Sequence, residues 1–236
     1  MYFLCRYLLQ HHLRSQRFFA PMVIYVTTVM LFYSYKPNPI ADSYSFTAML
    51  LFGGAAWLGL MVMNTEPSGQ IQLLIVHTGS KRKIAVGQMI CAWIMALSLT
   101  VFTVGYPVLF GMFNRHPTAN EWIITWSGHL TLSLLGISIA VFFQKSYISR
   151  FSRSMPALII VLILSFIQVS LAEKLPEALR WIAGILPPAI YLVQEMMNTE
   201  TMMLSSYFGI VLWNMVYAVV LLIIHFGWVN RREIRS

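Results

Sequence analysis

Charged side chains are scarce in this chain of 236 residues, of which 10% are Asp, Glu, Lys or Arg and 58% are hydrophobic. Its apolar runs contain no Asp, Glu or Lys, and their single arginine, Arg17, is the first residue of its run. The runs lie at 17–35, 45–63, 84–110, 122–143, 155–172 and 204–229. A helix needs about 20 apolar residues to cross the hydrocarbon core of a bilayer. The composition excludes an ordinary soluble domain and predicts an all-α integral membrane protein with six spans.

The apolar runs also have few groups that could carry protons or bind ions. Ion-coupled transporters and pumps place titratable or anionic side chains within the bilayer, where these bind the coupling ion. Beyond Arg17, the side chains in the runs that can become positively charged are His129 and His225. We interpret each as a neutral histidine that is hydrogen-bonded between helices, with a proton relay as the alternative. Transport coupled to an ion gradient is therefore disfavoured.

Motifs for enzymatic chemistry are missing as well. The chain has no His-Glu-x-x-His pattern, and His11-His12 lies among arginines, which favours a solvated helix face over a metal site. Gly79-Ser-Lys-Arg lacks the Gly-x-x-x-x-Gly-Lys-Ser/Thr spacing of a phosphate-binding loop. The two cysteines, Cys5 and Cys91, have no predicted partner in an oxidising space. We therefore expect no metal, no bound nucleotide or other cofactor, no enzymatic activity and no disulfide in this chain.

The net charge of +8 reflects where basic residues lie along the chain and does not indicate a nucleic-acid surface. With the N-terminus in the cytoplasm, six spans leave four basic residues outside, Lys36, Arg115, Lys174 and Arg180. The inner basic residues are Arg6, Arg14, Arg17, Lys81, Arg82, Lys83, Lys145, Arg150, Arg153, Arg231, Arg232 and Arg235. Six of the eight acids then lie outside, at Asp42, Glu121, Glu173, Glu177, Glu195 and Glu200. Because cytoplasmic loops are rich in Lys and Arg, both termini are expected in the cytoplasm.

Residues 1–16 have the pattern of a helix that lies along a membrane surface. Arg6, Gln10 and Arg14 recur at helical spacing on one side, while apolar residues gather on another. We expect an interfacial helix that contacts the lipid bilayer and leads into the first span.

Residues 173–203 are too apolar for a plain loop and too interrupted for a seventh span. Pro176 can start one short helix, Gly184 can end it, and Pro187-Pro188 can start a second. Non-helical backbone at membrane depth must be covered by protein or water. We expect a broken, partly re-entrant helical hairpin on the outer side, between the fifth and sixth spans.

Small residues mark two spans for close helix packing. The second span contains Gly53, Gly54, Ala55, Ala56 and Gly59. The fourth has small residues at spacings of three and four, which are Ser133, Gly136 and Ala140. Such residues let the backbones of neighbouring helices approach closely, so we expect both spans to be packed against other helices.

The most informative segment is the polar stretch 64–83 between the second and third spans. Thr65 or Ser68 can cap the start of a helix, and Gly79 can end it before a basic cluster. One face of that helix would carry three apolar residues, Ile71, Leu74 and Ile75. We expect a short cytoplasmic helix that presents a small apolar ridge.

This layout resembles the type-2 ABC exporter permeases, which have a leading interfacial helix, six spans, a cytoplasmic helix between spans two and three and a broken outer hairpin. The local match is Glu66-Pro-Ser-Gly69-Gln-Ile-Gln-Leu73-Leu74, then Gly79-Ser80-Lys81-Arg82 and Gly87-Gln88. Members commonly have an acidic residue, a glycine, a helix with paired leucines, a Pro-x-Ser-Arg-like turn and a Gly-Lys pair. Here Thr78-Gly79 replaces the turn proline and Gln88 replaces the lysine.

The resemblance implies that residues 66–76 form a coupling helix seated in a cleft of a separate ABC ATPase dimer, which binds ATP and Mg. The implied contacts are Glu66, Gly69, Ile71, Leu74, Ile75 and Arg82. Ile71, Leu74 and Ile75 would be buried anchors, with Glu66 and Arg82 as charges at the rim.

The resemblance also implies a second permease copy, identical or closely related, with the substrate path between the two copies. Candidates for that path are Trp57, Gln168 and Ser170. The implied function is export of a hydrophobic or amphipathic substrate, such as a peptide or antibiotic, across a bacterial plasma membrane.

Two other functions remain as alternatives. A membrane immunity or stress protein could bind a toxic peptide without ATP, and full protection of cells that lack the ATPase would favour it. An integral enzyme could act on lipid, and activity that survives mutation of the six histidines and the outer carboxylates would exclude it.

Overall fold

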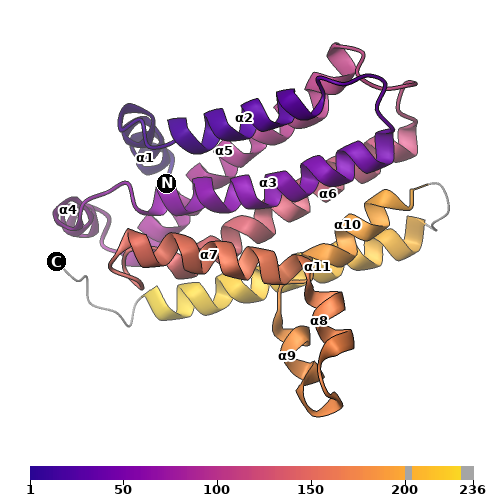
Figure 1. The fold of residues 1–236 in the computed structure, drawn as a ribbon. Coiled ribbons are helices and arrows are strands. Elements are labelled where there is room, and N and C mark those ends of the chain that lie inside the picture. The colour runs from indigo at the N-terminus through magenta and orange to yellow at the C-terminus, as the bar shows by residue number, and fades with distance from the viewer. Residues whose placement is uncertain (200–203, 230–236) are drawn as a thin grey trace.

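The computed structural model describes residues 1–199 and 204–229, and the regular elements within these residues are all helices. Six of them, α2, α3, α5, α6, α7 and α11, run roughly side by side as a bundle (Figure 1). The α-helices are α1 (Tyr2–Arg14), α2 (Phe19–Phe32), α3 (Ile40–Met63), α4 (Ser68–Thr78), α5 (Lys81–Leu109), α6 (Ala119–Ala140), α7 (Phe151–Phe166), α8 (Gln168–Lys174), α9 (Arg180–Ile185), α10 (Ala189–Met197) and α11 (Leu204–Val229). The 3-10 helices η1 (Val141–Phe143) and η2 (Glu177–Leu179) follow α6 and precede α9.

Four helices are long and apolar enough to cross a membrane, namely α3, α5, α6 extended by η1, and α11. The number rises to six if each of two bent helix pairs is one span, which is consistent with a multi-pass membrane protein. The pairs are α1 with α2, bent by 76°, and α7 with α8, bent by 71°. Four residues used in the topology prediction lie outside the described part of the chain: Glu200, Arg231, Arg232 and Arg235.

The fifth apolar run, 155–172, does not form one continuous helix as expected. Helix α7 ends at Phe166, and the chain turns at Ile167 before α8 begins. Gln168 then donates from Nε2 to the carbonyl oxygen of Ala183 in α9 at 2.9 Å. This bond ties α8 to α9, so the end of the run, which α8 contains, also forms part of a hairpin.

In the segment after this turn, helix ends lie close to the predicted helix-breaking residues. The bounds of α9 include Gly184 near its end, and α10 begins at Ala189, directly after Pro187-Pro188. Helices α8 and α9 pack on each other and project from the side of the bundle (Figure 1). Helix α10 instead packs back against α3 and α6. The projecting hairpin is therefore shorter than the predicted range 173–203 and begins earlier.

The tightest helix contact lies between α3 and α6. A Cβ atom added at Gly136 would lie 2.4 Å from the carbonyl oxygen of Phe52 and 3.3 Å from the amide nitrogen of Ala56. At Gly59 an added Cβ would lie 3.5 Å from the Cα of Ile137. The close packing predicted for these two spans is confirmed, and the two backbones meet where glycine removes the side chain.

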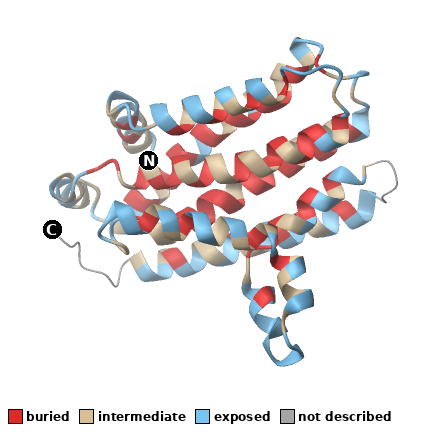
Figure 2. Cartoon of the chain, viewed as in Figure 1, coloured by how far each residue is buried: buried red, intermediate tan, exposed pale blue. Residues whose placement is uncertain are grey.

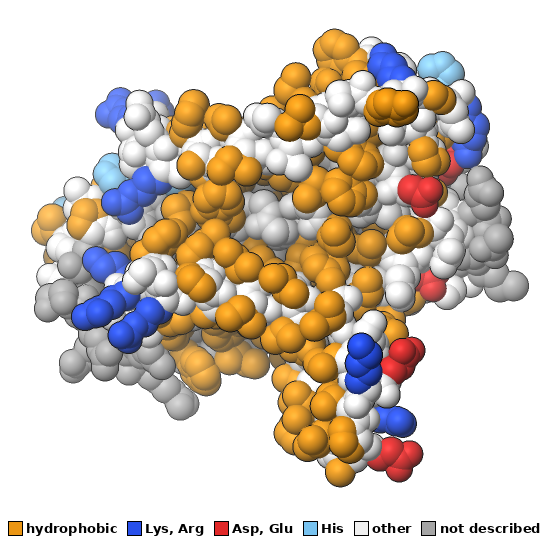
Figure 3. Space-filling view, viewed as in Figure 1, with side chains coloured by type: hydrophobic (Ala, Val, Ile, Leu, Met, Phe, Trp, Pro, Cys, Tyr) orange, Lys and Arg blue, Asp and Glu red, His pale blue; other side chains and the backbone are white. Residues whose placement is uncertain are grey.

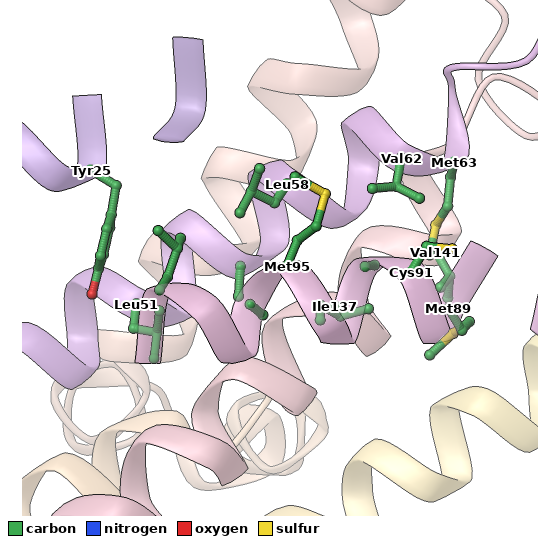
Figure 4. Close-up of a cluster of buried hydrophobic side chains, with 14 of the residues drawn as sticks. Tyr25, Leu51, Leu58, Val62, Met63, Met89, Cys91, Met95, Ile137 and Val141 are labelled. Atoms are coloured by element: carbon green, nitrogen blue, oxygen red, sulfur yellow. The ribbon is translucent and has the colours of Figure 1, made fainter. Parts of the chain in front are cut away.

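Buried apolar side chains from α2, α3, α5 and α6 fill the space around this contact. They include Tyr25, Leu51, Leu58, Met95 and Ile137 (Figure 4). Burial is concentrated along the central helices and falls off toward α11 (Figure 2). In the most apolar window of each helix, 67% of the residues are buried in α6 and 22% in α11. Helices α3 and α6 therefore form the centre of the bundle, and α11 lies at its periphery.

Both histidines of the apolar runs are hydrogen-bonded to another segment. His129 in α6 donates from Nδ1 to the carbonyl of Thr125 at 2.8 Å, and its Nε2 lies 3.2 Å from Thr47 Oγ1 in α3. His225 in α11 lies with Nδ1 3.1 Å from the hydroxyl of Tyr147, which precedes α7. The contact of His129 with Thr47 joins two helices, as predicted, whereas His225 contacts a residue of the turn between η1 and α7.

Replacing Gly136 by alanine is expected to destabilise the bundle by about 1–3 kcal/mol, because the new methyl group would overlap the backbone of α3. Gly53→Ala is the matched control, since an added Cβ at Gly53 has no atom within 4 Å. Both changes raise helix propensity equally, so the difference between them isolates the clash. Thermal unfolding in detergent micelles measures it, and equal melting temperatures would contradict the close contact.

Candidate functional site

Basic side chains gather at one end of the bundle, which we call the basic end (Figure 3). The described residues of this set are Arg6, Arg14, Arg17, Lys81, Arg82, Lys83, Lys145, Arg150 and Arg153. Helices α1 and α4 lie at this end, together with the C-terminal end of α11 (Figure 1). The basic residues that the topology analysis assigned to one side of the membrane, as far as they are described, are thus also together in space.

Helix α4 lies at the basic end between two breaks in the chain. Pro67 precedes it without a side-chain cap, and the Ser68 side chain lies outside the described part of the structure. The predicted Thr65 cap is wrong, because Thr65 Oγ1 donates to the carbonyl of Met61 at 2.8 Å. The predicted end at Gly79 is confirmed, since its φ of 68° is the left-handed conformation that glycine favours.

The exposed apolar face of α4 differs from the predicted ridge. Leu74 packs against the buried cluster of the bundle, and Ile71 and Ile75 are half-buried. Leu73 and Val76 are the large apolar side chains that α4 exposes, at 62% and 79%. The prediction placed the helix correctly but chose the wrong apolar side chains as the exposed ones, because periodicity alone does not show which side of a short helix faces the protein.

Glu66 also differs from its predicted role at an exposed rim. Its side chain is only 1% exposed, and one carboxylate oxygen lies 2.9 Å from Nδ1 of His11 in α1. Gly69 and Arg82 are exposed, as expected for surface contacts. Glu66 therefore contacts the chain's own N-terminal helix, and its assignment as a rim charge is corrected.

Two further contacts join α1 and the turn after it to the loop before α4. His12 Nδ1 lies 2.5 Å from Thr65 Oγ1, and Arg17 donates to the carbonyl of Asn64 at 2.5 Å. Because the Thr65 hydroxyl already donates to Met61, the His12 Nδ1–H must be the donor to Thr65. Three consecutive loop residues are thus held from one side, although the sequence offered no local pattern that connects segments so far apart.

The charges at this junction are shifted by burial. Burial raises the pKa of the Glu66 carboxyl above its usual range, while the nearby His11 and Arg17 oppose the shift. Burial, together with the charges of Arg17 and His11, lowers the pKa of His12 to about 4. His12 is therefore neutral near pH 7, which leaves His11 as the group within ion-pair distance of Glu66.

The three predicted path residues have different surroundings. Trp57 is half-buried on α3, and Ser170 is exposed on α8. Gln168 is buried and bonded to α9, as described above, so its amide fixes the hairpin and does not line an open path.

A polar cleft of about 340 Å³ lies at the opposite end of the bundle, between the starts of α3 and α6 and the end of α10. Arg115 binds both carboxylate oxygens of Glu121 at 2.7 and 2.8 Å, and Glu121 forms a capping box with Thr118. Sequence reasoning missed this pair, although the Thr-x-x-Glu pattern before an apolar run is a helix-start signal. Among the described residues no three His, Cys, Asp or Glu side chains are arranged to hold a metal ion.

Residues 40–235 match the sequence profile of a family described as a protein of unknown function, DUF2705. The chain belongs to this family. The DUF2705 match begins at the first residue of α3 and includes α4, whereas α1 and α2 precede it. No curated protein and no solved structure matches the chain.

Replacing Gln168 by leucine is expected to loosen the projecting hairpin, because the side-chain hydrogen bond from α8 to the carbonyl of Ala183 is lost and that carbonyl keeps only the Leu186 amide as a donor. A hydrogen bond of this kind contributes about 1 kcal/mol, so backbone amides of α9 should exchange about fivefold faster. Hydrogen exchange read by mass spectrometry measures the rate. Ser170→Ala, which changes an exposed residue of the same helix, is the control, and equal rates in both variants would contradict this role of Gln168.

Proposed function

We propose that this chain is the transmembrane subunit of an ATP-driven exporter, and that α4 docks into a separate ABC ATPase. The observation that carries the proposal is the presence of two exposed apolar side chains, Leu73 and Val76, on a short helix outside the apolar bundle. Apolar side chains inside a ring of charged groups are the usual anchors of a protein interface. Arg82 and Lys83, exposed at the start of α5, supply charges next to α4.

The energy for transport would come from the partner. Three of the helices that could span the membrane are α3, α5 and α6. The sequence has no Asp, Glu, Lys or Arg at positions 43–63, 84–114 and 122–144, which contain most of these helices. The sequence also has no phosphate-binding loop of the Gly-x-x-x-x-Gly-Lys-Ser/Thr type. ATP and Mg would therefore be bound by an ATPase dimer, and its closure would move α4 against the bundle.

The basic end would face the cytoplasm of a bacterial cell. Positive charge on the cytoplasmic side of spans supports this orientation, which puts the start of α1 and the end of α11 on that side of the plasma membrane. Helix α1 would lie along the inner surface of the bilayer. Its exposed Tyr2 and Phe3 would contact lipid, while Arg6 and Arg14 would contact the headgroups.

The projecting hairpin would lie along the outer leaflet. One side of the hairpin is apolar, and the other carries its charged groups (Figure 3). Exposed apolar residues of α9 are Trp181, Ile182 and Ile185. The charged residues are Glu173, Lys174, Glu177 and Arg180. An element with this segregation is stable at the boundary between hydrocarbon and headgroups.

The functional unit would contain two such chains, identical or closely related, with the substrate path between them. The sparsely buried α11 leaves apolar surface for lipid or for the second copy. Trp57 and Ser170 remain the candidates for contact with a hydrophobic or amphipathic substrate, probed by substitution once a cargo is known.

Replacing both Leu73 and Val76 by glutamate is expected to abolish co-purification with the ATPase and ATP-dependent export. Two buried apolar anchors typically contribute at least about 2 kcal/mol each, so affinity should fall by more than about a hundredfold. The measurement is ATPase recovery with the tagged chain from native membranes, together with ATP hydrolysis by the purified complex.

Gln72→Glu is the matched control, because it adds charge to an exposed position of α4 without removing an apolar anchor. The control should keep most of the ATPase. Undiminished ATPase recovery with the double variant, folded and inserted as the wild type is, would overturn the proposed docking site.

A further inference from the structure

We propose that α1 is a latch that positions α4, and that the contact of His11 with the buried Glu66 keeps the latch closed. The proposal concerns the same helix as the proposed ATPase contact, and names the residues that fix its position. It can be tested on this chain alone, without the partner.

The first part of the latch is the packing of α1 against α5. Leu8 is buried, and an added Cβ at Gly87 of α5 would lie 3.0 Å from Leu8 and 3.3 Å from Leu4. The thiol of Cys91 donates to the carbonyl of Cys5 at 3.4 Å. Because glycine lets the two helices approach closely, α1 is attached to the bundle along more than one turn.

The second part is the loop that leads into α4. This loop makes three contacts with α1 and the turn after it: Asn64 with Arg17, Thr65 with His12, and Glu66 with His11. The order of these contacts therefore runs in opposite directions along the two segments. The side chain of Asn64 also accepts a hydrogen bond from the amide nitrogen of Lys145 at 2.6 Å.

Only a proline separates Glu66 from α4, which ends at Gly79 and is followed directly by α5. The position of α4 is therefore set at its first turn by α1 and at its last turn by α5. Releasing the loop from α1 would leave α4 held by its junction with α5 and by the packing of Leu74 on the bundle.

The third part is the charge balance around Glu66. The titratable and charged groups that face it are Tyr7 and His11 of α1 and Arg17 of the following turn. The guanidinium of Arg17 is bonded to a backbone carbonyl, and His12 is neutral near pH 7. Among the described residues, His11 is thus the counter-charge at contact distance for a carboxylate that is almost fully buried.

A buried carboxylate that loses its counter-charge is strongly destabilising. While Glu66 is protonated, its side chain leaves no charge buried. When Glu66 ionises, the new charge lies in an almost fully buried position, and the loop gains free energy by moving into water.

The sign of the pH dependence follows from the same balance. The pKa of Glu66 is raised in the folded protein from its ordinary value of 4.5, so the stabilising contribution is complete at low pH. It is lost as pH rises through the raised value. The latch should therefore be closed on the acidic side and open on the alkaline side of the Glu66 transition.

The experiment measures the distance between α1 and α4 with spin labels in lipid nanodiscs. Labels at Gln10→Cys and Gln72→Cys use exposed positions, in a background where Cys5 is alanine and the fully buried Cys91, which contacts α1, is kept. Between about pH 5 and pH 9 the distance distribution should change from narrow to broad, and the ratio of open to closed states should rise up to about tenfold per pH unit.

Glu66→Gln should keep the distribution narrow at every pH, because the amide is neutral and does not titrate. His11→Asn should move the broadening to higher pH, because His11 lowers the pKa of Glu66 in the folded protein and asparagine carries no charge. His77→Gln, which removes an exposed histidine of α4 away from the latch, should respond to pH as the wild type does.

A distance that is independent of pH in the wild type, or a transition that persists in Glu66→Gln, would overturn the latch. If Glu66→Gln does not fold, the His11→Asn shift decides the question. Because no ATPase is present, the latch can stand while ATPase recovery with Leu73→Glu and Val76→Glu refutes the docking site, and the docking site can stand while the latch fails.

Discussion

The contact of two backbones at the centre of the bundle is the constraint on which the rest of the structure depends. Where Phe52 of α3 meets Gly136 of α6, there is no room for a side chain, and the two helices form one unit. Helices α5 and α10 pack against this unit, and α11 packs on α6 alongside them. The position of α4 follows, because it connects the end of α3 to the start of α5.

The sequence predicts most of this core because close packing in an apolar surrounding requires small residues at helical spacing. It also predicts the long helices and the breaks at Gly79 and Pro187-Pro188, where one residue type has a strong local preference. The end of α7 could not be predicted in this way. The helix stops at an apolar residue, and the side chain that secures the turn, Gln168, bonds to Ala183, which is distant in sequence.

The candidate site shows the same limit more clearly. Composition and the helix-breaking residues predicted a short polar helix at the basic end. Its outward face and the role of Glu66 depend on α1, which lies more than fifty residues earlier. The sequence shows that a carboxylate is present at this position. Only the fold shows that the carboxylate is buried against a histidine, which turns a presumed surface charge into an internal contact.

The packing of α3 on α6 also has a consequence for synthesis. Phe52 enters the membrane well before Gly136 is translated, and at ribosomal rates the interval is on the order of ten seconds. During this time α2 and α5 can already pack on α3, but the part of α3 that meets α6 has no partner from the chain's own sixth helix. Membrane insertases that shield such faces would therefore determine how much of the chain reaches its native bundle, independently of how stable that bundle is once formed.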